Sequence, residues 1–285
     1  MKNHLFLALQ YIIPQHLLSR FAGKLCDLKK PIKFKNWLIK SAIRRYKIDM
    51  SIAQSENLND YPTFNAFFTR YLKADARPIA SGDNLIVSPV DGAISQISNI
   101  YDTKLIQAKG INYSLWRLLA GDSELVKTFK NGCFTTIYLS PRDYHRIHMP
   151  ITGTLEKCIY VPGHLFSVNP LTVYNVPDLF ARNERLITIF QTALGKMALI
   201  FVGATLVAGI HTVFQGAVTP CKKRKIQTWD YTEQNLVFEK GQELGHFQFG
   251  STVILLFPEN SIEWSTQLHE TSPVQLGQMI AKIRS

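Results

Sequence analysis

Three short segments contain side chains that could together carry out nucleophilic and acid–base chemistry. Asp91 precedes a glycine, His145 and His148 lie three residues apart, and Ser251 follows Gly250. Serine is a weak nucleophile at its own pKa and needs a neighbouring base, and a carboxylate that orients a histidine supplies one. Unrelated folds build this geometry in different chain orders, so the order Asp, His, Ser excludes no fold. We take Asp91, His148 and Ser251 as candidate catalytic residues.

Each segment has a simpler interpretation when it is taken alone. Asp-Gly is usually a turn, two histidines at this spacing are usually structural, and Gly-Ser before an apolar run usually starts a strand. No cysteine or carboxylate pattern completes a metal site, so we expect no metal. We expect free thiols in a reducing compartment for the four widely spaced cysteines, Cys26, Cys133, Cys158 and Cys221.

The same segments resemble the bacterial pyruvoyl-dependent phosphatidylserine decarboxylases. The resemblance includes SPVDG, YLSPRDYHRIHMP and FGST, at residues 88–92, 138–150 and 249–252. One position departs from the family pattern, because Phe249 stands where leucine is expected; the change keeps an apolar neighbour and leaves Gly250-Ser251 intact. The resemblance extends over nearly the whole chain and also includes residues 61–78, 107–119, 161–169, 179–185 and 201–210.

The resemblance implies that the chain cleaves itself between Gly250 and Ser251, with Asp91, His148 and Ser251 as the triad. The Ser251 hydroxyl attacks the carbonyl of Gly250, and elimination and hydrolysis then leave a covalent pyruvoyl group derived from Ser251. Glycine suits this position because the absent Cβ permits an unusual backbone geometry. The large chain (1–250) and the small chain (251–285) are expected to remain associated.

The implied reaction is the decarboxylation of phosphatidylserine to phosphatidylethanolamine and CO2. The pyruvoyl carbonyl forms a Schiff base with the substrate amine and acts as an electron sink. We expect His145 to donate the proton that the resulting carbanion needs. By resemblance, residues 165–169 and 201–210 wall the pocket, although a plain core role fits their apolar members equally well. The alternative is an uncleaved serine hydrolase acting on lipid or ester substrates, which would stay one chain on a gel.

The N-terminal region combines positive charge with apolar side chains. Residues 1–50 contain eleven lysines and arginines against two aspartates, a net charge of +9 out of +11 for the whole chain. This asymmetry favours a polyanionic partner, either a membrane surface or nucleic acid. A basic and apolar sequence is typical of an interfacial helix, although a helix packed on its own domain has a similar pattern. We expect phosphatidylserine and an anionic membrane surface as partners, and no nucleic acid.

No segment has the roughly 18 uninterrupted apolar residues of a spanning helix. Residues 5–13 are not followed by a small-residue cleavage site, which argues against a secretory signal. The expected location is therefore the cytoplasmic side of the cell membrane, as a peripheral protein. The sequence is compatible with a homo-oligomer and does not give the number of subunits.

The pattern of apolar residues predicts an α+β fold. Residues 1–78 are expected to form amphipathic, membrane-facing helices, with helical periodicity over 3–75 and Thr63 as an N-cap. Residues 79–285 are expected to form a β-rich catalytic domain of antiparallel, sandwich-like sheets, with a helical insert at 114–120 and an exposed loop at 220–234. Predicted strands are 133–139, 155–162, 186–190, 199–202, 205–210 and 252–257.

Overall fold

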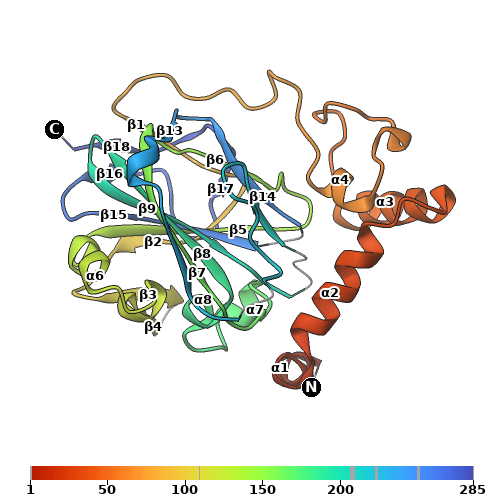
Figure 1. Cartoon of the computed structure of the whole chain (residues 1–285), viewed down its shortest axis with the longest axis horizontal. Helices are drawn as coiled ribbons and strands as arrows, with labels where there is room; N and C mark the ends of the chain where they lie inside the picture. The colour runs from red at the N-terminus through yellow and green to blue at the C-terminus, as the bar shows by residue number, and fades with distance from the viewer. Residues whose placement is uncertain (1, 109, 206–208, 222–223, 249–250, 285) are drawn as a thin grey trace.

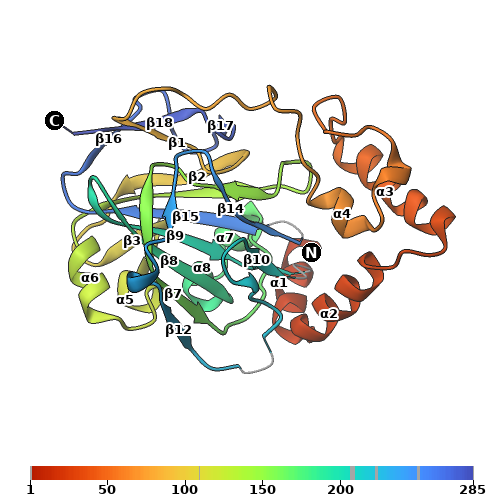
Figure 2. The ribbon, with the colours of Figure 1, turned by 45° about the horizontal axis from the view of Figure 1, so that its top comes forward.

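The computed structural model describes residues 2–108, 110–205, 209–221, 224–248 and 251–284. A helical N-terminal part lies to one side of a β-rich body (Figures 1 and 2). No helix of the described residues is long and apolar enough to cross a membrane. The N-terminal helices are α1 (Lys2–Ile12), α2 (Gln15–Cys26), α3 (Ile32–Tyr46), the 3-10 turn η1 (Leu58–Asp60) and α4 (Phe64–Phe68).

The helical prediction for residues 3–75 is only partly correct. Between α3 and α4 the chain is not helical except at η1, and residues 69–75, after α4, are not helical either. The side chains of Asp49 and Asn57 accept hydrogen bonds from backbone N–H groups two residues later, at 2.9 and 3.1 Å. Such local bonds favour turns over helix. The predicted cap of α4 is confirmed, since the Thr63 hydroxyl accepts from the N–H of Ala66 at 3.0 Å.

The helical part has a small apolar core of its own. Ile39 of α3 and Phe67 of α4 are completely buried. Their burial holds α4 against α2 and α3, so the segment that precedes the β-rich body has a defined position. The members of this core are Cys26, Ile39, Ala42, Ile48, Tyr61, Phe64, Phe67 and Phe68.

The β-rich body is built around a nine-stranded antiparallel sheet with the order β12-β7-β8-β9-β15-β5-β2-β17, and β13 also pairs with β7. The central strands β5, β8, β9 and β15 are buried almost throughout, as expected for continuous apolar runs. Their bounds are β2 (Gly92–Asn99), β5 (Cys133–Leu139), β7 (Gly153–Val161), β8 (Arg185–Thr192), β9 (Gly195–Val202), β12 (Gln227–Asp230), β13 (Val237–Phe238), β15 (Ser251–Phe257) and β17 (Pro273–Val274).

Smaller sheets and short helices complete the body. One sheet has the order β11-β10-β14-β6, with bounds Gly216–Ala217, Ile210–Thr212, Glu243–Phe247 and Arg146–His148. A second has the order β1-β18-β16, with bounds Leu85–Val87, Met279–Ile283 and Ile262–Trp264, and β3 (Lys104–Ala108) pairs with β4 (Ile111–Ser114). The helices are α5 (Leu115–Leu118), α6 (Ser123–Phe129), α7 (Pro170–Val173), α8 (Leu179–Arg182) and the 3-10 turn η2 (Thr232–Gln234).

The α+β class and the antiparallel sheets are confirmed, and two local predictions are wrong. The stretch 220–234 contains the strand β12, which pairs with β7; its alternating exposure and polar sequence explain why it resembled a loop. The strand predicted at 205–210 is a turn at Thr205, its residues 206–208 lie outside the described residues, and β10 begins only at Ile210. The four cysteines are free thiols.

Candidate active site

Four strands of the central sheet begin or finish at the same end of the sheet, and two of the predicted site residues lie at this end. β15 begins with Ser251, which pairs with Leu139 at the end of β5. β9, on the other side of β15, ends at Val202, which pairs with Thr252. β2 begins directly after Asp91 and pairs with β5. Because β5 lies between β15 and β2, the start of β15 at Ser251 and the start of β2 after Asp91 are separated by two interstrand distances, about 10 Å.

Ser251 is completely buried, and its hydroxyl makes no hydrogen bond to a described residue. A buried hydroxyl without a partner costs about 1–3 kcal/mol, so its presence in a native fold calls for an explanation. Gly250, the other half of the predicted cleavage site, and Phe249 lie outside the described residues.

The contacts of His148 fix which of its ring nitrogens has a free lone pair. Its backbone N–H donates to the carbonyl of Pro89 at 2.9 Å, two residues before Asp91. Its Nδ1 lies 2.8 Å from the carbonyl oxygen of Gly241, which can only accept, so Nδ1 carries the proton and Nε2 the lone pair. The Tyr144 hydroxyl lies 3.3 Å from Nε2. Burial lowers the pKa of the imidazole, which is therefore neutral near pH 7.

Asp91 is held by a cation that was not among the predicted site residues. Nε and Nη2 of Arg77 donate to the two carboxylate oxygens at 2.8 and 2.6 Å, and the N–H of Leu276 donates at 2.8 Å. The two side chains of the pair are only 13% and 8% exposed, so solvent screens them little. No hydrogen bond between described residues joins Asp91 to His148. The Asp91 charge still favours the protonated ring through space, and its role in self-cleavage stays a prediction.

His145 is completely buried, with its ring centroid 4.1 Å from that of Phe68. Its Nδ1 donates to the carbonyl of Asp143 at 2.8 Å, whereas its buried Nε2 has no partner among the described residues. Burial, reinforced by the charge of Arg70, lowers the pKa of His145 to about 3. The ring is therefore neutral, and its Nε2 can accept a hydrogen bond but takes up a proton only with difficulty. The predicted role as a proton donor requires that Nε2 first take up a proton.

The buried, neutral His145 should make the fold sensitive to acid. The folded-state pKa is about 3, against 6.5 for the ordinary group, so between these values the unfolded chain binds more protons than the folded chain. The free energy of unfolding should therefore fall as the pH drops below about 6.5. His145→Asn keeps a donor for the Asp143 carbonyl and does not titrate, so it should make this fall shallower.

Thermal unfolding temperatures of both proteins at about pH 7 and about pH 4.5 provide the measurement. His246, whose pKa burial lowers to about 4, adds a separate acid dependence that His145→Asn should leave in place. The same loss of stability in the wild-type protein and in His145→Asn would contradict the assignment of His145 as buried and neutral.

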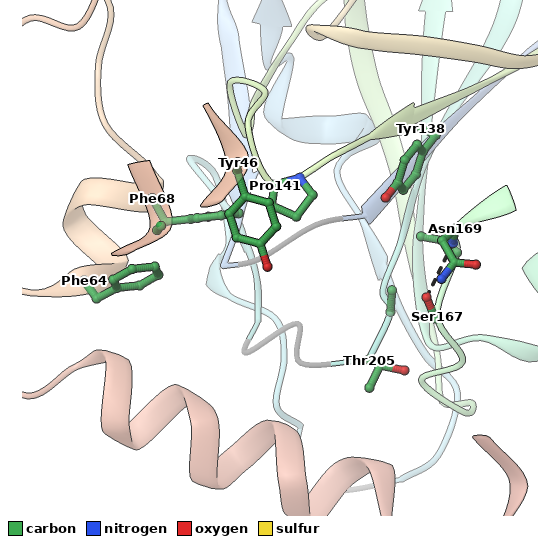
Figure 3. Close-up of a pocket in the computed structure, with 11 residues that line it drawn as sticks. Tyr46, Phe64, Phe68, Tyr138, Pro141, Ser167, Asn169 and Thr205 are labelled. Carbon is green, nitrogen blue, oxygen red and sulfur yellow. Dashed lines mark hydrogen bonds between the residues drawn. The ribbon is translucent and has the colours of Figure 1, made fainter. Parts of the chain in front are cut away.

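A cavity of about 170 Å³ lies at this end of the sheet, between the helical part and the β-rich body (Figure 3). The predicted wall segments contribute Ser167, Val168, Asn169, Ala204 and Thr205. The opposite wall comes from the N-terminal helices, which the sequence did not place at the site. Side chains on that wall are Ala42, Tyr46, Phe64 and Phe68, and β5 and the residues after it add Tyr138 and Pro141.

Comparison with known proteins gives the family. A family model described as phosphatidylserine decarboxylase matches residues 64–282. The chain belongs to this decarboxylase family. A second model, described as PSD, matches residues 5–47. The phosphatidylserine decarboxylase proenzyme of Alcanivorax borkumensis is 53% identical over 277 residues, which are 97% of this chain and 95% of that protein. The proenzymes of Psychromonas ingrahamii (50%, over 95% of each chain) and Marinobacter nauticus (49%, over 99% of each chain) are similarly close.

Several groups at the site of this decarboxylase-family chain were not predicted. Arg77 and Arg70 lie within the stretch 61–78 and Tyr144 within 138–150, so the resemblance contained them without indicating what they contact. Gly241 acts through its backbone carbonyl, which leaves no side-chain signature. Among the described residues, no group of three or more His, Cys, Asp or Glu could hold a metal ion.

Proposed function

We propose that this chain decarboxylates phosphatidylserine to phosphatidylethanolamine and CO2. The observation that carries the proposal is the buried hydroxyl of Ser251, which has no partner among the described residues. Ser251 is the first residue of β15, at the end of the sheet beside the cavity. The relatives, which are named phosphatidylserine decarboxylase proenzymes, support phosphatidylserine as the substrate. Release of CO2 from phosphatidylserine, and not of a fatty acid, distinguishes this reaction from ester hydrolysis by an uncleaved serine hydrolase.

The reactive group forms from the chain itself. Nε2 of His148 takes the Ser251 proton while the hydroxyl oxygen bonds to the carbonyl carbon of Gly250, and the C–N bond breaks as the serine nitrogen gains a proton. Loss of the Cα proton then breaks the bond from Cβ to the ester oxygen and leaves a carboxylate on Gly250. Water converts the dehydroalanine at residue 251 to a pyruvoyl group and releases ammonia.

Tyr144 controls access to the base in this scheme. Its hydroxyl lies 3.3 Å from Nε2 of His148, and burial raises the pKa of the phenol, so the hydroxyl stays protonated and acts as the donor in this contact. The hydroxyl must move aside before His148 can take the proton of Ser251. Asp91, held by Arg77, then stabilises the imidazolium through its charge.

The two products of cleavage, residues 1–250 and 251–285, stay associated because the small chain supplies the middle of the sheet. β15 pairs with β5 along its whole length, from Ser251 to Phe257, and with β9 on its other side. Every residue of β15 is buried. Removing this strand would expose a continuous apolar run and two rows of backbone groups.

The surroundings of Ser251 fit its conversion to a pyruvoyl group, because no described residue depends on its hydroxyl for a hydrogen bond. A pyruvoyl group supplies a carbonyl that condenses with the substrate amine and withdraws electrons while CO2 leaves. Nε2 of His145, once protonated, gives its proton to the carbon that has lost CO2. Phe68 packs against the imidazole, which is completely buried.

Residues 1–78 form a membrane-associating region and residues 79–285 the catalytic domain in this proposal, with the protein on the cytoplasmic side of the cell membrane. Support comes from α2, whose polarity is reversed relative to a helix of a soluble protein: Gln15 and Ser19 are buried against the protein, whereas Leu17 and Phe21 are 60% and 67% exposed. An exposed apolar stripe beside many lysines and arginines suits an anionic lipid surface.

The exposed stripe can be tested without disturbing the buried face. Leu17→Gln combined with Phe21→Gln should weaken binding to phosphatidylserine vesicles by at least about tenfold, because each apolar side chain contributes on the order of 1.5–3 kcal/mol when buried. Vesicle co-sedimentation measures this, and binding of the unchanged protein should weaken in high salt without vanishing.

The matched control places the same number of glutamines on the β-rich body, with Tyr101→Gln and Val237→Gln at two other exposed apolar positions. Self-cleavage should continue in both double variants. Equal vesicle binding by the α2 variant and the control would show that α2 does not contact the membrane. Deletion of residues 1–30 is a harsher test, because Gln10 and Gln15 accept hydrogen bonds from the backbone of Ser167 and Leu165 beside the cavity.

A further inference from the structure

A second cavity, of about 270 Å³, lies next to the first. Tyr138 and Val168 line both cavities and therefore stand between them. The hydroxyl of Tyr138 makes no hydrogen bond to a described residue. The outer wall is formed by β2 and by α7 with the residues beside it, through Ala93, Ile94, Ser95, Pro170, Val173 and Tyr174.

The second cavity has the chemistry of a hydrocarbon site. Ile94 and Val173 are buried, and together with Pro170 they provide an apolar lining. Its charged side chain, Glu270, is engaged at the rim, where it accepts a hydrogen bond from the Tyr174 hydroxyl at 2.5 Å. An apolar cavity offers water few partners and so favours an apolar occupant.

The volume suits a segment of alkyl chain. An apolar cavity of about 150 Å³ accommodates benzene, with its six carbon atoms, so a cavity of about 270 Å³ holds on the order of ten methylene carbons. Each methylene removed from water contributes about 0.8 kcal/mol, so even a few of them affect substrate binding.

We infer that the second cavity binds part of one acyl chain of the phospholipid substrate. This inference rests on the proposed decarboxylation, because it needs a headgroup in the first cavity beside residue 251. The two cavities share a wall, so the glycerol backbone of a lipid held there lies within reach of both. The site makes the enzyme selective for long-chain substrates, independently of membrane binding by α2.

The test is a substitution in β2 that fills the second cavity with a larger side chain. Ser95 lies where the pairing of β2 with β5 is irregular, between Ile94 and Gln96. It is half-buried, lines the cavity and makes no hydrogen bond through its side chain to a described residue, so a larger side chain there meets no paired residue of β5. Ser95→Trp should lower kcat/KM for dioleoyl-phosphatidylserine in detergent micelles by at least about tenfold, the effect of losing two methylene contacts. Its kcat/KM for dibutanoyl-phosphatidylserine should stay within about twofold, because four-carbon chains are too short to fill the site.

Ser98→Trp makes the same replacement on the same strand but outside the cavity. It should leave kcat/KM for both substrates unchanged. Intact-mass analysis verifies that each variant is cleaved. If Ser95→Trp is not cleaved, the smaller replacement Ser95→Leu is used for the test. It should lower kcat/KM for the dioleoyl substrate only. An unchanged dioleoyl rate, or equal losses on both substrates in a fully cleaved variant, would overturn the acyl-chain site. A wild-type protein that decarboxylates neither lipid would instead refute the proposed function.

Discussion

The Ser251→Ala variant is expected to remain one chain of 285 residues and to release no CO2 from phosphatidylserine. The physical reason is that the attacking oxygen and the later pyruvoyl group both come from this one side chain. Intact-mass analysis of the wild-type protein should instead give two chains, 1–250 and 251–285. The smaller chain should resist Edman degradation because its first residue has no free amine.

Thr252→Val is the matched control for this experiment. Thr252 is the next residue of β15, is equally buried, and also has a hydroxyl without a partner among the described residues. Removing an unpaired buried hydroxyl while keeping the side-chain shape costs little stability. This variant should therefore cleave and turn over as the wild-type protein does. A wild-type protein that is active and uncleaved, or cleavage of Ser251→Ala, would refute both the cofactor and the mechanism.

The two histidines should separate into different steps. His148→Asn retains an amide donor for the Gly241 carbonyl but has no basic nitrogen at the position of Nε2. It should slow self-cleavage by about 10²–10⁴-fold, the usual contribution of a general base. His145→Asn likewise retains a donor for the Asp143 carbonyl. It should cleave normally and then decarboxylate about 10²–10⁴-fold more slowly, because it cannot carry the proton.

The measurements are the fraction of cleaved chain over time, by mass spectrometry, and CO2 release per cleaved chain. Each variant serves as the other's control, since both are imidazole-to-amide replacements that keep the contact made by Nδ1. Normal decarboxylation by matured His145→Asn would require a different proton carrier. Prompt cleavage of His148→Asn would remove His148 as the base.

The sequence was sufficient where local chemistry decides the outcome. The apolar run before Ser140 predicted a strand over 133–139, and β5 has these bounds. Thr63 was identified as a helix cap, because capping depends on residues only a few positions apart. The sequence was not sufficient to predict β12. Its polar residues form a strand only because they pair with the edge of β7.

The candidate site shows the same division. The residue types in three segments were enough to identify Asp91, His148 and Ser251 as candidates, because nucleophilic chemistry requires few kinds of side chain. Their contacts were not predictable in this way. Arg77 pairs with Asp91 from 14 residues earlier, and the Gly241 carbonyl holds His148 from 93 residues later.

What the sequence determined by itself was the family, the candidate residues and the unequal distribution of charge, since all three depend on residue identity and spacing along the chain. Only the tertiary structure decided that Ser251 is buried with no partner among the described residues, that His145 is a neutral hydrogen-bond acceptor, and that α2 turns Leu17 and Phe21 outward. These properties depend on which groups from distant segments exclude water from a side chain or donate to it, and that depends on how the sheets and helices pack.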